Sequence, residues 1–323
     1  MIAALSRYHE LITKELAGYK FPEEPGNLYD PIRYFLTLGG KRMRPVLALM
    51  GAELFDGKLE DAIHAGMAVE LFHNFSLIHD DIMDEAPLRR GKETVHTKWN
   101  TNIGILSGDA LMIESYKCLA NYEPKILAEL LPLFNQTAIE VCEGQQMDMD
   151  FESESVVSTE DYIQMIAFKT AVLLGCSLKM GAITAGASKE DADDLYQFGL
   201  NLGIAFQVQD DILDVYADQN KFGKQVGGDI IANKKTFLLL QALKDANPSQ
   251  KERFDSLLLS KDPAVKVKGV MELYDELDIY QKATAKKNYY HDIAMDNLKH
   301  IKVNDDKKVP LRELAGFLLE REH

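Results

Sequence analysis

The 323-residue sequence is short of cysteine, of basic residues and of long apolar runs, and each shortage argues against a class of protein. Its three cysteines are odd in number and far apart, which indicates core or free thiols in a reducing compartment rather than a disulfide framework. Lys and Arg number 36 against 51 Asp and Glu, and the net charge of −15 argues against a nucleic-acid partner. No apolar run approaches the ~20 residues that cross a bilayer, and the first residues do not resemble a secretory signal. We therefore expect a cytoplasmic protein without a transmembrane segment.

Proline is also scarce, with 10 residues, and glycine clusters at a few places instead of marking regular short turns. Apolar residues recur at intervals of three and four, as in Leu195, Phe198 and Leu202, which favours an all-α protein. The predicted helices cover residues 4–18, 29–38, 41–54, 59–84, 103–121, 124–149, 159–183, 189–217, 234–245, 249–259, 263–303 and 309–321. The helix at 263–303 should break near Asp278. No low-complexity tract or linker divides the chain, so we predict a single domain over residues 1–323.

Two short acidic segments have nearly the same sequence. Asp80–Asp84 is Asp-Asp-Ile-Met-Asp, and Asp210–Asp214 is Asp-Asp-Ile-Leu-Asp. On a helix the first and last aspartates share a face, and the middle one lies about 100° round the axis. Carboxylates this close repel one another unless a cation lies among them, and hard oxygen ligands without nearby Cys or paired His favour Mg²⁺. We therefore expect two helices that face one another across a metal-filled cavity. The candidate metal ligands are Asp80, Asp81, Asp84, Asp210, Asp211 and Asp214.

Basic residues gather beside these acidic segments although the whole chain is negative. Polar loops are predicted after both segments, at 86–101 and 218–233; the first contains Arg89, Arg90 and Lys92, and the second contains Lys221 and Lys224, with Lys234 and Lys235 next to it. Gly39–Pro45 is a glycine pair followed by three cations. Glycine lets a backbone approach an anion, and arginine binds phosphate oxygens bidentately. The pattern predicts two diphosphates, one bound through metal and the other by cations alone.

A metal-neutralised diphosphate is a good leaving group, and no activated nucleophile is visible. The predicted chemistry is therefore ionisation to a carbocation, followed by attack of a carbon–carbon double bond.

These motifs, in this order, resemble those of the trans (E)-polyprenyl diphosphate synthases. The matching segments are Gly39–Pro45, Ser76–Asp84 with Leu88–Gly91, Lys169–Ala171, Phe206–Asp214, Phe222–Lys224 and the tail Leu311–Leu318. The resemblance implies an all-α, single-domain helical bundle of the isoprenoid synthase type with a central cavity. It also implies a Mg²⁺-dependent prenyltransferase, commonly a homodimer, that condenses isopentenyl diphosphate head to tail with dimethylallyl, geranyl or farnesyl diphosphate.

The same resemblance implies a role for each matching residue. The six aspartates would hold three Mg²⁺ ions on the allylic diphosphate, with Asp80 and Asp210 foremost. The cations on that diphosphate would be Arg89, Lys169 and Lys224, with Lys234 nearby. Isopentenyl diphosphate would be held by Lys41, Arg44, His73 and Arg90. Thr170 and Gln207 would face the developing allylic cation, and the released diphosphate would remove the proton. For three of these residues an alternative role that involves no substrate stays open. His73 would then be a core histidine, Lys169 would be a side chain that extends out of the core, and Lys234 would be part of a charged helix start.

Product length should depend on what blocks the prenyl tail along the first acidic helix. Phe75 precedes Asp80 by five residues, roughly 7.5 Å along the axis, and Phe72 lies a turn deeper, roughly 12 Å away. Ser76 beside Phe75 is small, and family members with one aromatic residue at these two near positions tend to stop at C20, whereas two aromatics tend to give C15. The two-residue insertion in the first motif that many bacterial C15 enzymes have is absent.

We therefore predict geranylgeranyl diphosphate as the product, with farnesyl diphosphate as the first alternative. A longer product would follow if Phe75 merely packs against a neighbouring helix. Ser107, Leu111 or Met112 on the facing helix could also override the effect of Phe75 on product length. Two other functions are weaker alternatives. A class I terpene cyclase would have a mixed Asn/Ser/Glu second metal motif and no second diphosphate site, and a non-catalytic synthase subunit would have lost one aspartate motif.

Overall fold

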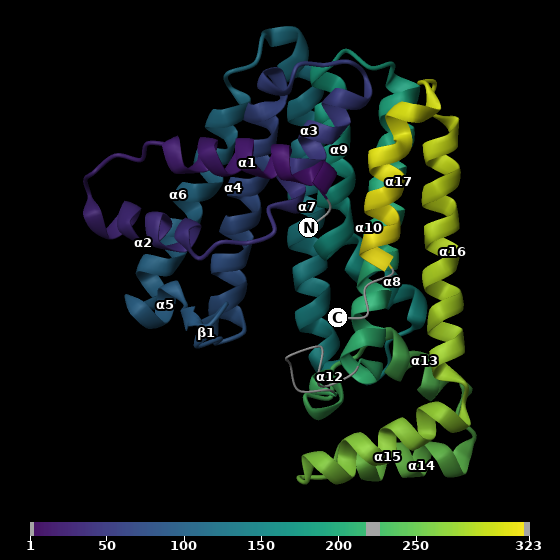
Figure 1. Ribbon diagram of the computed structural model, residues 1–323. Helices are drawn as coiled ribbons and strands as arrows, with labels where there is room; N and C mark the ends of the chain where they lie inside the picture. The colour runs from purple at the N-terminus through teal and green to yellow at the C-terminus, as the bar shows by residue number, and fades with distance from the viewer. Residues whose placement is uncertain (1–2, 218–226, 320–323) are drawn as a thin grey trace. The chain divides into compact units, whose positions relative to one another are not determined.

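The computed structural model describes residues 3–217 and 227–319, and this part of the chain is helical apart from one short hairpin and the connecting turns (Figure 1). The prediction of an all-α fold is confirmed. The chain divides into two compact units. Unit 1 is Met1–Asn135 with Cys176–Leu195, and unit 2 is Gln136–Gly175 with Tyr196–His323. The single domain expected from the sequence stays a prediction.

Apart from the short α5 and α12, the helices lie where the periodicity of apolar residues placed them, and their ends agree within four residues. Their bounds are α1 Ala3–Gly18, α2 Gly26–Thr37, α3 Met43–Leu54, α4 Leu59–Met83, α5 Val95–Lys98, α6 Thr101–Leu119, α7 Pro124–Ser153, α8 Thr159–Ile166, α9 Val172–Thr184, α10 Lys189–Tyr216, α12 Gly228–Ile231, α13 Phe237–Asp245, α14 Pro248–Leu258, α15 Pro263–Glu276, α16 Ile279–His300 and α17 Asp305–Leu319. The expected break near Asp278 is confirmed, because this residue has φ 54° and separates α15 from α16.

In unit 1, α4 packs against both α3 and α6, and this explains why it is apolar on more than one face. Phe72 of α4 and Leu111 of α6 are fully buried. Helix α3 meets α9 at small residues. A Cβ on Gly51 would lie 3.2 Å from Leu178 Cα, and one on Gly181 would lie 2.8 Å from the backbone of Ala48. Backbones this close leave no room for larger side chains.

In unit 2, an apolar core joins α8, α10, α13 and α15, and α14 packs on α15 (Figure 1). The helix starts in this unit are well capped. Ser158 and Asp161 form a reciprocal capping box at α8, and Asn247 and Gln250 form another at α14. These caps fix where the helices begin and hence which of their residues point into the core.

The sequence did not predict three local features. The loop at 86–101 contains, besides α5, a hairpin of strands β1 (Leu88–Arg89) and β2 (Lys92–Glu93). The helix predicted at 159–183 is interrupted by a π-helical turn, η1 (Ala167–Ala171). Helix α12 lies within the second predicted loop. One- and two-turn elements are too short for a periodicity signal, and the π-turn carries no residue signature.

One described helical run, Thr159–Thr184, is long and apolar enough to cross a membrane by length and composition alone. The sequence analysis did not single out this run, in which Lys169 and Lys179 interrupt the apolar residues. In the structure 61% of its apolar window is buried, as in a core helix, so the run is weak evidence for a membrane span.

Candidate active site

The first aspartate motif lies at the C-terminal end of α4, where its outer and middle aspartates differ in environment. Asp84 is the exposed C-cap, and its N–H donates to the Asp80 carbonyl at 2.8 Å. Asp80 is half-buried and shares a face of the helix with Asp84. Asp81 is only 2% exposed. The two outer carboxylates therefore project from one face, whereas the middle one points into the protein.

Asp81 is paired with Arg89 of strand β1. Arg89 Nε donates to the two carboxylate oxygens at 2.9 and 2.8 Å, and Arg89 Nη2 lies 2.8 Å from Oδ1. Charge-assisted contacts of this kind are stronger than neutral hydrogen bonds. In this structure Arg89 neutralises Asp81 and fixes the hairpin to the end of α4. Its predicted contact with a diphosphate stays a prediction.

The hairpin directs the next arginine to a different element. Leu88 pairs with Glu93 and Arg89 with Lys92, which leaves Arg90 and Gly91 as a two-residue turn with φ 52° and 74°. Positive φ at both positions is the type I′ geometry favoured in tight hairpins. Arg90 Nη1 donates to the Gly39 carbonyl. A Cβ on the next residue, Gly40, would lie 2.7 Å from the same nitrogen, and the φ of 139° at Gly40 would strain any residue with a side chain.

The segment after the glycine pair is anchored by Arg42. This residue is the left-handed N-cap of α3, with φ 47°. Its guanidinium forms a buried ion pair with Glu70 of α4 and donates to the Leu36 carbonyl at 2.7 Å. Glu70 also accepts from the Asn74 side chain at 2.9 Å. Arg42 thus ties the glycine loop to α4 and to the end of α2.

Arg44 and His73 meet behind this loop, with Arg44 Nη1 3.0 Å from His73 Nε2. Burial lowers the pKa of His73 well below its ordinary value, and the positive charges of Arg44, Arg90, Arg89 and Arg42 lower it further. The ring is therefore neutral at pH 7 and accepts the hydrogen bond from Arg44. Burial lowers the pKa of Arg44 to about 10, which leaves it cationic, and its buried Nε has no hydrogen-bond partner in the described chain.

The four guanidinium groups near His73 are only half neutralised by carboxylates. Arg42 pairs with Glu70 and Arg89 with Asp81. Arg44, by contrast, bonds to a neutral imidazole, and Arg90 bonds to a backbone carbonyl. The structure thus brings together three of the four residues predicted to bind isopentenyl diphosphate: Arg44, His73 and Arg90. The fourth, Lys41, is exposed on the same loop. The arrangement has the charge and the close backbone approach of an anion site.

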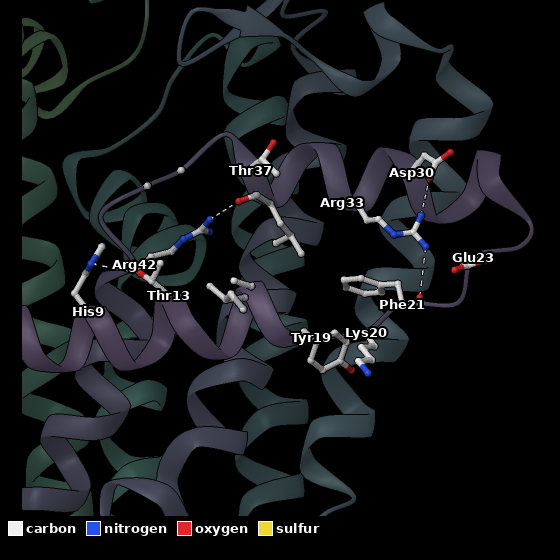
Figure 2. Close-up of a pocket in the computed structure, with 15 residues that line it drawn as sticks. His9, Thr13, Tyr19, Lys20, Phe21, Glu23, Asp30, Arg33, Thr37 and Arg42 are labelled. Atoms are coloured by element: carbon white, nitrogen blue, oxygen red, sulfur yellow. Dashed lines mark hydrogen bonds and ion pairs between the residues drawn. The ribbon is translucent and has the colours of Figure 1, made fainter.

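A cavity of about 1050 Å³ lies on another side of the glycine loop, against α1 and α2 (Figure 2). Its arginines are already bonded within the protein. Arg33 lies 2.6 Å from Asp30 and donates to the Phe21 carbonyl at 3.4 Å, and Arg42 is turned towards Leu36, as the dashed lines in Figure 2 show. None of the four residues predicted for isopentenyl diphosphate is among the described residues that line this cavity. We therefore do not assign it to the anion.

The residues predicted to set product length lie in the core of unit 1. Phe72 is fully buried and Phe75 is 8% exposed, with their ring centroids 5.4 Å apart. Phe72 also lies 5.4 Å from Phe134 of α7. Ser76 donates to the His73 carbonyl at 2.9 Å, so its hydroxyl is used within the helix. On α6, Ser107 and Leu111 are fully buried and Met112 is half-buried. Whether Phe75 blocks a prenyl tail stays a prediction.

In unit 2 the second motif repeats the pattern of a buried middle aspartate. Asp211 is 7% exposed and accepts from the Tyr162 hydroxyl at 2.7 Å and from the Phe237 N–H at 3.1 Å. Burial raises the pKa of Asp211 to about 7. Asp210 and Asp214 are half-buried, and Asp214 accepts from the Asp229 N–H at 3.0 Å. The middle aspartate therefore joins α10 to α8 and to the start of α13.

Lys169 and Thr170 lie in the π-helical turn η1, a type of turn that frequently marks functional sites. Lys169 Nζ is 2.6 Å from Asp148 Oδ2 of α7, and both side chains are about a quarter exposed, at 25% and 24%. Two glycines let neighbouring helices approach the turn. A Cβ on Gly144 of α7 would lie 2.7 Å from Lys169 Cα, and one on Gly203 of α10 would lie 2.7 Å from the side chain of Ala171.

The remaining predicted residues of unit 2 are less well defined. Gln207 is half-buried on α10. Lys224 lies outside the described residues. The backbone N–H of Lys234 donates to the Asp229 carbonyl at 2.9 Å, and Lys235 donates to the carbonyls of Phe151 and Glu154.

Sequence reasoning missed the residues that hold the predicted ones in place, chiefly Glu70, Asp148 and Tyr162. One available signal was Gly144, because an isolated glycine inside a long helix costs about 1 kcal/mol and usually has a packing reason.

No group of three His, Cys, Asp or Glu side chains suited to a metal ion occurs in residues 3–217 and 227–319. The donor chemistry still fits Mg²⁺, because Asp80 and Asp84 present carboxylate oxygens on one face of α4. Asp81 and Asp211 fit less well, since their oxygens are bonded to Arg89 and Tyr162. The magnesium sites, and the cavity expected between the two acidic helices, stay predictions.

The chain is similar to known proteins along nearly its whole length. The model of the polyprenyl synthetase family matches residues 25–294. The chain is 35% identical to the short chain isoprenyl diphosphate synthase of Methanothermobacter thermautotrophicus, over 99% of this chain and 98% of that protein. It is 38% identical to the geranylgeranyl diphosphate synthase of Saccharolobus solfataricus, over 89% and 88%. A crystal structure of geranylgeranyl pyrophosphate synthase has 40% sequence identity and a TM-score of 0.93, with 99% of each chain covered.

Proposed function

This chain belongs to the polyprenyl synthetase family, and we propose that it is a prenyltransferase that condenses isopentenyl diphosphate head to tail with an allylic diphosphate. The observation that carries the proposal is the group of partly neutralised arginines around the neutral His73. Arg44 and Arg90 keep positive charge that no carboxylate offsets, beside a glycine pair where a backbone and an anion can approach closely. A diphosphate matches that charge and shape.

The allylic diphosphate would be bound by the aspartate motifs. Asp80, Asp84, Asp210 and Asp214 would hold the Mg²⁺ ions, three in all, and the bound metal would supply charge neutralisation for the leaving group. Asp81 and Asp211 would fix the ends of the two helices, as their bonds to Arg89 and Tyr162 support.

The π-turn in unit 2 would bring cation and hydroxyl to the same substrate. Lys169, positioned by Asp148, would bind the allylic diphosphate, together with Arg89, Lys224 and Lys234. Thr170 and Gln207 would present oxygens to the developing allylic cation. No protein base is needed if the released diphosphate takes the proton.

We further propose geranylgeranyl diphosphate as the product. The support is the small Ser76 beside Phe75, together with relatives that are themselves named geranylgeranyl diphosphate synthases.

A homodimer is also proposed. Its support is an outward apolar group on α6, where Ile105, Leu106 and Ile113 are 40%, 59% and 56% exposed. The cytoplasmic location stays a prediction.

The first experiment is a condensation assay. Purified protein is incubated with Mg²⁺, radiolabelled isopentenyl diphosphate and each of dimethylallyl, geranyl and farnesyl diphosphate, and the dephosphorylated products are separated by chain length. A C20 alcohol, lost when EDTA removes the metal, is expected. A C15 or longer alcohol would contradict the product but not the enzyme class. Absence of condensation with every starter would contradict the enzyme and favour a non-catalytic subunit.

A matched pair of variants tests the anion site. Arg90→Met removes one of the two unneutralised cations, and a charged hydrogen bond contributes about 1.5–3 kcal/mol. The KM for isopentenyl diphosphate should therefore rise by roughly 10- to 150-fold, with the KM for the allylic substrate nearly unchanged. Arg33→Met, on α2 and in the lining of the cavity, is the control and should leave both KM values unchanged. Equal effects of the two substitutions would count against the assignment.

A further inference from the structure

His79 lies one residue before the first aspartate motif and has no role in the function proposed above. Its ring packs edge-on against Phe75, with ring centroids 4.8 Å apart and an interplanar angle of 68°. Its Nε2 lies 3.1 Å from the Ile105 carbonyl of α6, a distance and partner that make this nitrogen the donor. Asp109 Oδ1 lies 3.8 Å from the same nitrogen. The side chain is therefore held between α4 and α6.

Gly108 makes this position of the ring possible. A Cβ on Gly108 would lie 2.5 Å from His79 Cδ2, and nearer still to Nε2, so any larger residue would displace the imidazole. The small residue on α6 and the ring on α4 thus form one interlocking contact. Because Nε2 donates to Ile105, that nitrogen is not available as a base. The geometry points to a role in packing rather than in proton transfer.

The ring that His79 contacts is the one predicted to stop the prenyl tail. Phe75 is bounded by His79 on the side of the aspartate motif and by Phe72 on the other, with centroid distances of 4.8 and 5.4 Å. Phe72 is in turn fixed against Phe134 at 5.4 Å. Phe72 and Phe134 are fully buried, and neither ring can move without opening a cavity in the core. His79 is half-buried, so it is the boundary of Phe75 that can be removed with least damage to the core.

We propose that His79 is a positioning residue for product length, which acts by holding the Phe75 ring across the path of the growing prenyl chain. The proposal rests on the proposed prenyltransferase function. Without the imidazole, Phe75 can turn into the space beside Gly108, and the obstacle to the chain is lowered. The substitution should therefore lengthen the product without abolishing condensation.

The test compares the main products of four variants with that of the wild-type protein, under the same starter and Mg²⁺ concentration. His79→Ala should shift the main product by at least one isoprene unit, with total condensation retained. Phe75→Ala should lengthen it as well. In the double variant, His79→Ala should add nothing to Phe75→Ala, because the residue acts through that ring. His64→Ala is the control: it removes an imidazole that also packs edge-on against an aromatic ring and lies on the same helix, 15 positions earlier. Its product should be that of the wild type.

Three outcomes would overturn the proposal. They are an unchanged product length in His79→Ala, an equal lengthening with and without Phe75, and a loss of condensation without a change in length. If His79→Ala does not fold, His79→Ser also removes the ring contact and leaves the space beside Gly108 open, while it keeps a polar group at this half-buried position. It should shift the product in the same direction, and wild-type lengths from it would also overturn the proposal. Condensation by the wild-type protein, measured in the same series, separates failure of this inference from failure of the proposed function.

Discussion

Gly144→Ala should impair catalysis through a single methyl group that touches no substrate. The added Cβ would lie 2.7 Å from both Lys169 Cα and the Phe168 carbonyl carbon, and closer still to Lys169 N. Ordinary contact begins at 3.4 Å. The neighbours are backbone atoms of the π-turn, which cannot rotate out of the way as a side chain can. The turn that carries Lys169 and Thr170 must therefore move away from α7.

The structure gives the size of this effect. Relieving the closest contacts requires a displacement on the order of 1 Å, and a misplacement of that size can lower a rate by about 10²-fold. This corresponds to about 2.7 kcal/mol of lost transition-state stabilisation. Stability should change less, because alanine improves helix propensity by about 1 kcal/mol while overpacking costs about 1–3 kcal/mol. We expect a folded protein with a kcat lowered about 100-fold.

The measurement is kcat with both substrates saturating, together with urea unfolding. Gly316→Ala on α17 is the matched control, since its Cβ would meet nothing within 4 Å, and it should keep the wild-type kcat. In a Lys169→Ala background, Gly144→Ala should lower kcat much less, because both changes act on one group. A folded Gly144→Ala protein with wild-type kcat would refute the reasoning.

Three further changes should be visible in urea unfolding. Tyr162→Phe removes a donor from the buried Asp211 and should lower the free energy of unfolding by about 1–3 kcal/mol; an unchanged midpoint would show that the bond contributes nothing. Glu70→Ala leaves Arg42 buried without its carboxylate and should cost about 3–5 kcal/mol, whereas a loss below 1 kcal/mol would contradict the buried pair. The pKa of His73 is lowered in the folded state, so its neutral form stabilises the fold above pH ~6.5 and that stability is lost as pH falls, by up to about 1.4 kcal/mol per pH unit. Between pH 6.5 and 5, His73→Gln should show a shallower fall than the wild type, and parallel curves would contradict this.

The aspartate motifs show how far sequence reasoning reached. Spacing alone placed Asp80 and Asp84 on one face near the end of a helix, and the structure has them at the end of α4. Spacing could not separate the middle aspartate from the outer ones, because that difference depends on distant partners. Asp211 bonds to residues 49 and 26 positions away, and such tertiary contacts leave no local pattern.

The glycine-rich segment was anticipated in kind but not in detail. The sequence correctly marked residues 39–45 as a place where backbone and cations meet, since glycine and arginine have strong local preferences. The residue pattern did not distinguish the three cations, and only the family resemblance assigned Lys41 and Arg44 to a substrate and left Arg42 without a role. In the structure Arg42 is buried against Glu70 and Arg44 bonds to His73. Which cation is neutralised depends on the packing of α3 against α4, and this information is absent from the segment itself.

In the hairpin after α4, the two neighbouring arginines contact different parts of the protein. Arg89 bonds to Asp81 of α4, and Arg90 donates to the Gly39 carbonyl. Side chains alternate along a strand, so a shift of one residue would exchange their directions. A two-residue type I′ turn also cannot accommodate an inserted residue without a change of turn type, because loop length determines the turn type in a hairpin. The segment from Glu85 to Glu93 should therefore accept many changes of residue but no change of length. A library of single insertions and deletions across this segment should lose function at nearly every position, whereas substitutions at Leu88 or Lys92, both exposed, should be tolerated.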